Sequence, residues 1–221
     1  MKPEYMEKLA EKLSKSEPLD VAVFACLTSA FWATARLGEL TVQNLQAFNP
    51  ESHVKRSDLG EKIDEKGNRT VTMHVPKTKA SPLEGETLYW AKRNGPLDPD
   101  SALQKHLKIN NPPNNFHLFG YKSKGKMIPL TRRSFLLRLG SAAKAAKLEA
   151  LPGHSIRIGS TAEYLMKGLS FELMKVKGRW KSDAFHRYIR DHAMVLAPYM
   201  QEAPPETNDR FISIAIPPVR D

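Results

Sequence analysis

Between residues 153 and 190 the sequence concentrates polar side chains that suit phosphate chemistry. It reads Gly153-His154-Ser155-Ile156-Arg157, then Gly178-Arg179-Trp180, then Tyr188-Ile189-Arg190. Far upstream, Ala35-Arg36-Leu37-Gly38-Glu39-Leu40 adds Arg36 at the end of an apolar helical run. The guanidiniums of Arg36 and Arg157, the imidazole, the indole N–H and the phenol form a set able to bind and attack a phosphodiester without a metal ion.

The overall composition indicates a globular protein with a polyanionic partner. A chain of 221 residues that is 41% hydrophobic can bury a real core, as one large domain or two small ones. Lys and Arg number 34 against 24 Asp and Glu, a net charge of +10. That excess favours binding to DNA phosphates, although a solvated basic surface without a partner is the plainer alternative.

The cysteine count and the hydropathy indicate a chain without disulfides and an intracellular location. The single cysteine, Cys26, lies in an apolar helical run and cannot form a disulfide within one chain, so we expect a small core side chain. We see no run of apolar residues long enough to span a membrane and no cleavable signal, so we expect an intracellular protein without a membrane partner.

Apolar periodicity and capping residues predict an α+β chain that is mainly helical. We expect helices over residues 4–13, 18–35, 99–109, 131–147, 154–168 and 170–177, and a further helix that begins at Ser182-Asp183 and carries Tyr188. Alternating segments at 71–75 and 86–89, with a turn at 66–68, predict a small sheet between residues 52 and 89.

The order and spacing of these motifs, from about Leu19 to Tyr199, resembles the catalytic domain of the tyrosine recombinase (phage integrase) family. The resemblance implies that family's fold over residues 1–200, with a small three-stranded antiparallel sheet. It also implies an enzyme that cleaves and rejoins DNA strands. The family's preceding DNA-clamping domain is expected to be absent, since only about eighteen residues come before the match.

Each motif position carries an expected role by this resemblance. Tyr188 would attack phosphorus to give a 3′-phosphotyrosyl bond, and a lysine in a turn of the sheet would protonate the leaving 5′-oxygen. The implied catalytic residues are Arg36, Lys79, His154, Arg157, Trp180 and Tyr188. Glu39 would orient Arg36, and Lys77, Arg179 and Lys181 would contact nucleic acid.

Several of these assignments have competitors. Lys77 competes with Lys79 for the acid role, and either lysine could be a solvated surface charge. Trp180 stands where many family members have His, and a core aromatic is its alternative. Tyr164 and Tyr199 compete with Tyr188, although neither matches a family motif.

The expected reaction needs no cofactor. The other histidines show no His-Glu-x-x-His pattern, and we find neither a Cys-x-x-Cys pair nor a glycine-rich phosphate loop, so no metal or nucleotide is expected. The expected partners are double-stranded DNA and further copies of the chain, as a dimer or tetramer on DNA. A type IB topoisomerase and a non-catalytic DNA-binding module descended from a recombinase remain alternatives.

Two finer expectations concern origin and the C-terminal tail. The run from Gly178 to Phe185, with Tyr188-Ile189-Arg190, resembles recombinases of eukaryotic mobile elements of the Crypton or DIRS kind. That origin would imply a nuclear location, and any other a nucleoid or cytoplasmic one. In the tail, residues 201–221, the alternation over Phe211–Ile216 predicts a short strand that docks on a sheet edge or a neighbouring protomer.

Overall fold

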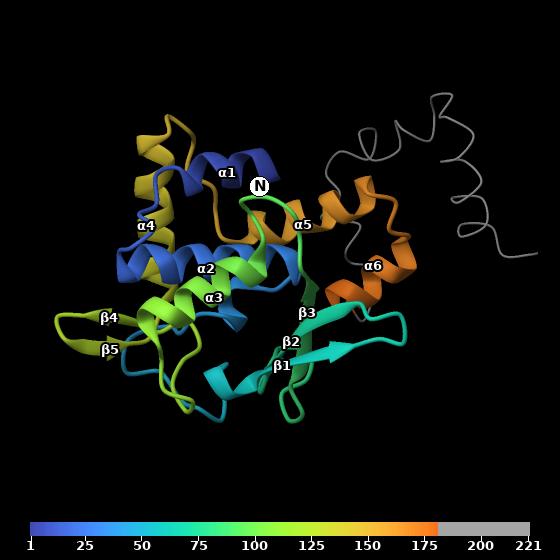
Figure 1. The fold of residues 1–221 in the computed structure, drawn as a ribbon, viewed down its shortest axis with the longest axis horizontal. Coiled ribbons are helices and arrows are strands. Elements are labelled where there is room, and N and C mark those ends of the chain that lie inside the picture. The colour runs from blue at the N-terminus through green and yellow to red at the C-terminus, as the bar shows by residue number, and fades with distance from the viewer. Residues whose placement is uncertain (181–221) are drawn as a thin grey trace, which may run out of the picture. The chain divides into compact units, whose positions relative to one another are not determined.

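The computed structural model describes residues 1–180 of the chain. The chain divides into two compact units, Met1–Arg157 and a second that begins at Ile158 (Figure 1). Within the described residues, no helix is both long and apolar enough to cross a membrane. The predicted helix of Tyr188, the domain boundary at residue 200 and the tail strand lie outside the described residues.

The first unit is built around one helix that is buried on nearly every side. Its helices are α1 (Pro3–Ala10), α2 (Pro18–Trp32), α3 (Pro99–Asn110), α4 (Arg132–Ala145) and the start of α5 (His154–Met166). Twelve of the fifteen residues of α2 are buried, because α2 lacks a polar face and packs against α3, α4 and the hairpin of β4. Cys26 is fully buried in this helix, as predicted.

A small antiparallel sheet completes the core of the first unit. Its strands β1 (Leu59–Ile63), β2 (Arg69–Val75) and β3 (Glu86–Ala91) pair in the order β1-β2-β3 (Figure 1). Val71 lies opposite Trp90, and Met73 lies opposite Leu88. These four side chains are buried on one face while their neighbours point outward, which is the alternation expected of a half-buried sheet. The predicted α+β fold with a three-stranded sheet is confirmed.

The end of α2 differs from the prediction and determines how the chain presents Arg36. We expected the helix to run through Ala35, but α2 ends at Trp32. Thr34 takes a left-handed conformation with φ of 52°, and the N–H groups of Thr34 and Ala35 donate to the carbonyls of Phe31 and Ala30. This is a Schellman arrangement with threonine where glycine is usual. The chain then turns, and Arg36 precedes a 3-10 helix, η1 (Leu37–Glu39).

One hairpin was not predicted. Strands β4 (Tyr121–Ser123) and β5 (Lys126–Ile128) pair across Lys124 and Gly125, which both have positive φ. Two consecutive residues with positive φ form a tight turn whose twist matches that of the two strands it connects. Each strand is only three residues long, too short to show an alternating pattern in the sequence.

The second unit contains the remainder of α5, then α6 (Phe171–Gly178). The Ser170 side chain accepts a hydrogen bond from the N–H of Leu173, as predicted for the residue that caps this helix. Leu165 and Met174 form a buried apolar cluster, with Tyr164, Leu169 and Trp180 packed against it.

Candidate functional site

Arg36 is held in place by Glu39. The Arg36 Nη1 donates to Glu39 Oε1 at 2.9 Å, and the Arg36 backbone N–H donates to Glu39 Oε2 at 2.9 Å. The Glu39 side chain is only 6% exposed, whereas that of Arg36 is 34% exposed. The carboxylate therefore fixes the Arg36 backbone and one guanidinium nitrogen, while part of the Arg36 side chain remains open to solvent.

A hydrogen bond brings Arg157 of α5 to the same turn. Arg157 is 3% exposed, and its Nη1 donates to the backbone carbonyl of Thr34 at 2.6 Å. Thr34 is two residues before Arg36, so two arginines distant in the sequence converge on one turn.

Close packing at the start of α5 supports this convergence. A Cβ atom on Gly153 would lie 2.7 Å from Leu37 Cδ2, so a larger residue there would require the Leu37 side chain to move. His154 is the first residue of α5, is exposed, and lies one turn before Arg157 on the same helix. The structure thus gathers Arg36, Glu39 and Arg157 around one turn, with His154 on the adjoining helix start.

The two candidate lysines flank an anchored threonine between β2 and β3. Thr78 is buried; its Oγ1 donates to Glu86 Oε2 at 2.5 Å and accepts from the N–H of Ser81 at 3.0 Å. Lys77 and Lys79, on either side of it, are both exposed. The loop is therefore fixed at Thr78, and both lysines remain candidates.

In the second unit, Gly178 positions the Trp180 ring. A Cβ atom on Gly178 would lie 1.5 Å from Trp180 Cζ3, so the indole packs flat on the glycine. Arg179 has φ of 56°, and the N–H of Trp180 donates to the carbonyl of Lys175 at 3.0 Å. The Gly-x-Trp motif therefore marks the end of α6, where the chain turns back at Arg179 and places Trp180 on Gly178. Trp180 is half-buried against the apolar cluster, which fits the core-aromatic alternative as well as a donor role.

Lys177 is a feature that sequence reasoning missed. Burial, and secondarily the charge of Arg179, lowers the pKa of Lys177 to about 7. Its Nζ lies 5.6 Å from the centroid of the Tyr164 ring. Tyr164 thus packs in a cluster inside the second unit. Tyr188, Tyr199 and Lys181 lie outside the described residues.

The histidines of the first unit belong to its core, apart from His53, His74 and the exposed His154. The His106 Nε2 contacts the Leu118 carbonyl at 2.9 Å, and its Nδ1 contacts the Asn110 Nδ2 at 3.0 Å. Burial lowers the pKa of His106 to about 4 and that of His117 to about 3. Within residues 1–180, no group of three or more His, Cys, Asp and Glu side chains is placed to hold a metal ion.

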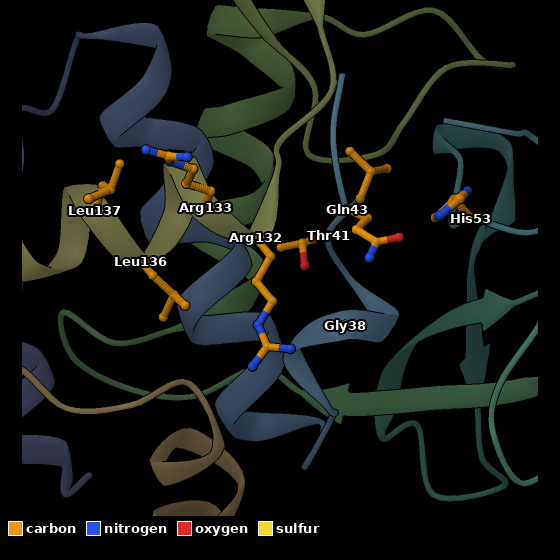
Figure 2. A pocket seen from close by; sticks show the side chains of 9 residues that line it. Gly38, Thr41, Gln43, His53, Arg132, Arg133, Leu136 and Leu137 are labelled. Atoms are coloured by element: carbon orange, nitrogen blue, oxygen red, sulfur yellow. The ribbon is translucent and has the colours of Figure 1, made fainter. Parts of the chain in front are cut away.

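A pocket of about 690 Å³ lies next to the Arg36 turn (Figure 2). One wall is the first turn of α4, with Arg132 and Arg133; the other is the segment from Gly38 to Gln43, together with His53. Sequence reasoning did not single out these residues. The only signal was a pair of adjacent arginines after the helix cap Thr131, which is common on basic surfaces.

Comparison with known proteins supports one fold. No protein-family model matches the sequence, and no curated protein matches it. Among solved structures, it is similar to a Flpe–Holliday junction complex, with a TM-score of 0.54 and 15% identity over 95% of this chain and 49% of the Flpe chain. The chain shares the fold of Flp recombinase.

A second solved structure agrees. An FLP recombinase–Holliday junction complex matches with a TM-score of 0.54 and 17% identity over 84% of this chain and 48% of the FLP chain. This chain therefore spans about half the length of the Flp chains it matches. At such identities the likeness establishes the fold.

Proposed function

We propose that this chain is a site-specific DNA recombinase of the tyrosine recombinase family. It cleaves and rejoins DNA strands through a 3′-phosphotyrosyl intermediate, without a metal ion or nucleotide. The observation that carries the proposal is the hydrogen bond from Arg157 to the Thr34 carbonyl, which brings the His-x-x-Arg helix to the turn of Arg36. The shared fold supports it, because the similar Flp structures are complexes with Holliday junctions.

The two arginines would hold one phosphate of the DNA backbone. A guanidinium presents a planar set of donors that matches two phosphate oxygens, and two such groups also stabilise the extra charge of a pentacoordinate transition state. Glu39 fixes Arg36 for this role, and the Thr34 carbonyl fixes Arg157. Trp180 would add one more donor to a phosphate oxygen, but an indole cannot accept a proton.

Cleavage then exchanges one phosphodiester for another. The Tyr188 oxygen forms a bond to phosphorus as the bond to the 5′-oxygen breaks. His154 takes the phenol proton, and Lys79 or Lys77 gives a proton to the leaving 5′-oxygen. Rejoining reverses these transfers with a 5′-hydroxyl as the nucleophile. The bond energy stays in the phosphotyrosine, so no external energy source is needed.

The two alternatives are less well supported. In type IB topoisomerases the position of His154 is normally Lys or Arg, and that of Trp180 is His. Both departures favour a recombinase. A non-catalytic module is disfavoured because each motif position still holds a residue able to perform its role.

Assembly and origin complete the proposal. Recombination joins strands from two sites, so copies of the chain would assemble as a dimer or tetramer on double-stranded DNA. Lys77, Arg179 and Lys181 would contact its backbone, and residues 201–221 would pack on a neighbouring protomer. An origin in a eukaryotic mobile element of the Crypton or DIRS kind would place this assembly in the nucleus.

Three DNA assays separate the three functions. We expect covalent attachment to nicked duplexes, and strand transfer between two duplexes that carry the same selected sequence. Efficient relaxation of supercoiled plasmid without strand transfer would instead indicate a topoisomerase. DNA binding with neither reaction would indicate a non-catalytic module.

A further inference from the structure

The arginines of the pocket beside Arg36 differ from the other arginines of the first unit. Arg138, on the same helix, forms a two-pronged ion pair with Asp20, and Arg36, Arg56 and Arg69 also bind neighbouring side chains. Arg157 donates to the Thr34 carbonyl, and the Arg93 guanidinium lies 3.7 Å from the centroid of the Trp32 ring. Within residues 1–180, Arg132 and Arg133 form no ion pair and no side-chain hydrogen bond, and both are exposed. The Arg132 side chain extends toward Gly38 while that of Arg133 leaves α4 in another direction (Figure 2), and an arginine without a partner at a pocket favours an anionic ligand.

The rest of the lining is not what a bare phosphate requires. Leu136 and Leu137 of α4 also line the pocket, each one turn beyond an arginine, and Leu137 is 62% exposed. Gln43 stands across the pocket with its amide in solvent, and His53 lies beyond it (Figure 2). A volume of about 690 Å³ falls within the roughly 300–1,000 Å³ of pockets for organic ligands. The ligand therefore has an anionic part, an apolar face and a polar edge.

We propose that this pocket binds one unpaired nucleotide of a DNA strand. The phosphate binds Arg132, the base lies on Leu136 and Leu137, and the Gln43 amide donates to and accepts from the edge of the base. This inference rests on the proposed recombinase function. A strand released by cleavage must unpair from its complement before it can join another duplex, so an unpaired nucleotide arises beside the reacting phosphate.

The backbone links this pocket to the Arg36 turn. The N–H of Val42 donates to the Leu130 carbonyl at 3.0 Å, and the N–H of Arg132 donates to the Val42 carbonyl at 2.9 Å. Gly38 of η1 lines the pocket, and the Arg132 side chain extends toward it (Figure 2). A nucleotide in the pocket therefore lies against the same short segment that carries Arg36 and Glu39.

The test compares two DNA ligands of equal charge. Both are duplexes with one bulged nucleotide, which is adenosine in one and an abasic site in the other. Because stacking of a base contributes to affinity, we expect the adenosine bulge to bind about tenfold more tightly. Fluorescence anisotropy gives the two dissociation constants, and 2-aminopurine at the bulge reports the environment of the base directly.

Pocket variants locate the effect. Leu137→Ser and Gln43→Ala should bring the ratio of the two dissociation constants close to one, with the affinity for the abasic DNA unchanged. Arg132→Ala should weaken binding of both DNAs. Lys144→Ala is the matched control, because Lys144 is an exposed cation on the same helix outside the pocket. It should leave the ratio unchanged, and a circular-dichroism melt checks that each variant is folded.

Two results would overturn the proposal. Equal affinity of the wild-type protein for both bulges would show that the pocket contacts only a backbone phosphate. A preference that survives both Leu137→Ser and Gln43→Ala would place the base elsewhere. Either result could occur while the protein still forms a covalent adduct with DNA, and the proposed function would then stand. If no adduct formed and the preference for adenosine were retained, the proposed recombinase function would be wrong and the nucleotide pocket would stand.

Discussion

The turn around Thr34 shows how individual residues prepare Arg36. A threonine in the left-handed region costs about 1–3 kcal/mol, because its branched Cβ crowds the backbone. The buried bond from the Arg157 guanidinium to the Thr34 carbonyl contributes about 1.5–3 kcal/mol, which is typical of a charged donor. The two effects are of similar size, so Arg157 offsets the strain of the turn that sets Arg36 in place.

At the same scale, the two lysines beside Thr78 can be told apart by the leaving group. A 5′-thiolate leaves without a proton, so it does not need a general acid. We expect Lys79→Ala to cleave ordinary nicked DNA about 100-fold more slowly or worse, and to recover on a 5′-bridging phosphorothiolate. Single-turnover cleavage rates on the two substrates give the comparison.

Lys77→Ala is the matched control for that measurement. It removes an equally exposed charge on the other side of Thr78. Thiolate rescue of Lys77→Ala alone would transfer the acid role to Lys77. Rescue of neither variant would remove both lysines from this role.

Among the secondary elements, α6 offers a direct test of how Trp180 is held. Gly178→Ala would drive a methyl group into the indole ring, so the ring must move. We expect a loss of about 1–3 kcal/mol in the free energy of unfolding, as in overpacked cores, together with slower cleavage. Urea unfolding and cleavage of nicked DNA measure the two effects.

Gly140→Ala serves as the control, because a Cβ atom there meets nothing within 4 Å. Alanine is a better helix former than glycine, so this variant of α4 should gain about 0.5–1 kcal/mol. A Gly178→Ala protein as stable and as active as wild type would show that Gly178 does not position Trp180.

The packing of α4 on the N-terminal helices includes one ion pair beside its buried apolar side chains. Arg138 donates from Nε and Nη2 to the two Asp20 oxygens at 2.5 and 2.7 Å, and from Nη2 to the Lys12 carbonyl at 2.9 Å. Arg138→Ala leaves a buried carboxylate without its main partner, so we expect a loss of about 3 kcal/mol in unfolding free energy. Arg132→Ala on the same helix should change it by less than about 0.5 kcal/mol. Equal effects of the two variants in chemical denaturation would contradict this account.

Most elements were predictable because their signals are local. Asp98, Thr131 and Ser170 each accept a hydrogen bond from the first turn of the helix they precede, as their positions in the sequence indicated. The end of α2 was not predictable. Its apolar pattern continues to Ala35, and only the left-handed Thr34, stabilised by Arg157 from far along the chain, stops the helix.

The candidate site likewise contains residues that the sequence could indicate and residues that it could not. The motif spacing named Arg36, Glu39, His154 and Arg157 as candidates, because each lies in a short stretch that matches a family motif. The pocket of Arg132 and Gln43 could not be foreseen, since it forms where residues 38–43 meet α4 through backbone bonds at Val42. The low pKa of Lys177 likewise arises from burial, which the sequence does not show.

For the molecule as a whole, the buried histidines predict a loss of stability in acid. Their folded pKa values, about 4 for His106 and about 3 for His117, lie below the ordinary value of roughly 6.5. Between these limits the unfolded chain binds protons that the folded chain does not. The contribution of these two histidines to the free energy of unfolding is therefore fully present above pH 6.5. It falls as the pH drops, by up to about 1.4 kcal/mol per pH unit for each histidine.

His117→Leu tests this slope. The two ring nitrogens of His117 have no hydrogen-bond partner within the described residues, so an apolar side chain costs little there at neutral pH. In urea unfolding from pH 6 to 4.5, the variant should lose about 1.4 kcal/mol less per pH unit than wild type. His74→Gln, at an exposed position on β2, should keep the wild-type slope. An unchanged slope in His117→Leu would show that His117 is not the acid-sensitive group.

The central claim is a covalent bond between Tyr188 and DNA. The direct measurement incubates the protein with a pool of nicked duplexes whose sequence is randomised around the nick. Because of the nick, cleavage leaves a short fragment with the 5′-hydroxyl, which diffuses away and prevents rejoining. Adducts that survive denaturation are digested with protease and nuclease, and mass spectrometry locates the modified residue. We predict a 3′-phosphotyrosyl adduct at Tyr188, and its loss in Tyr188→Phe with DNA binding retained. An adduct at Tyr164 or Tyr199, or no adduct from the whole pool, would contradict the account.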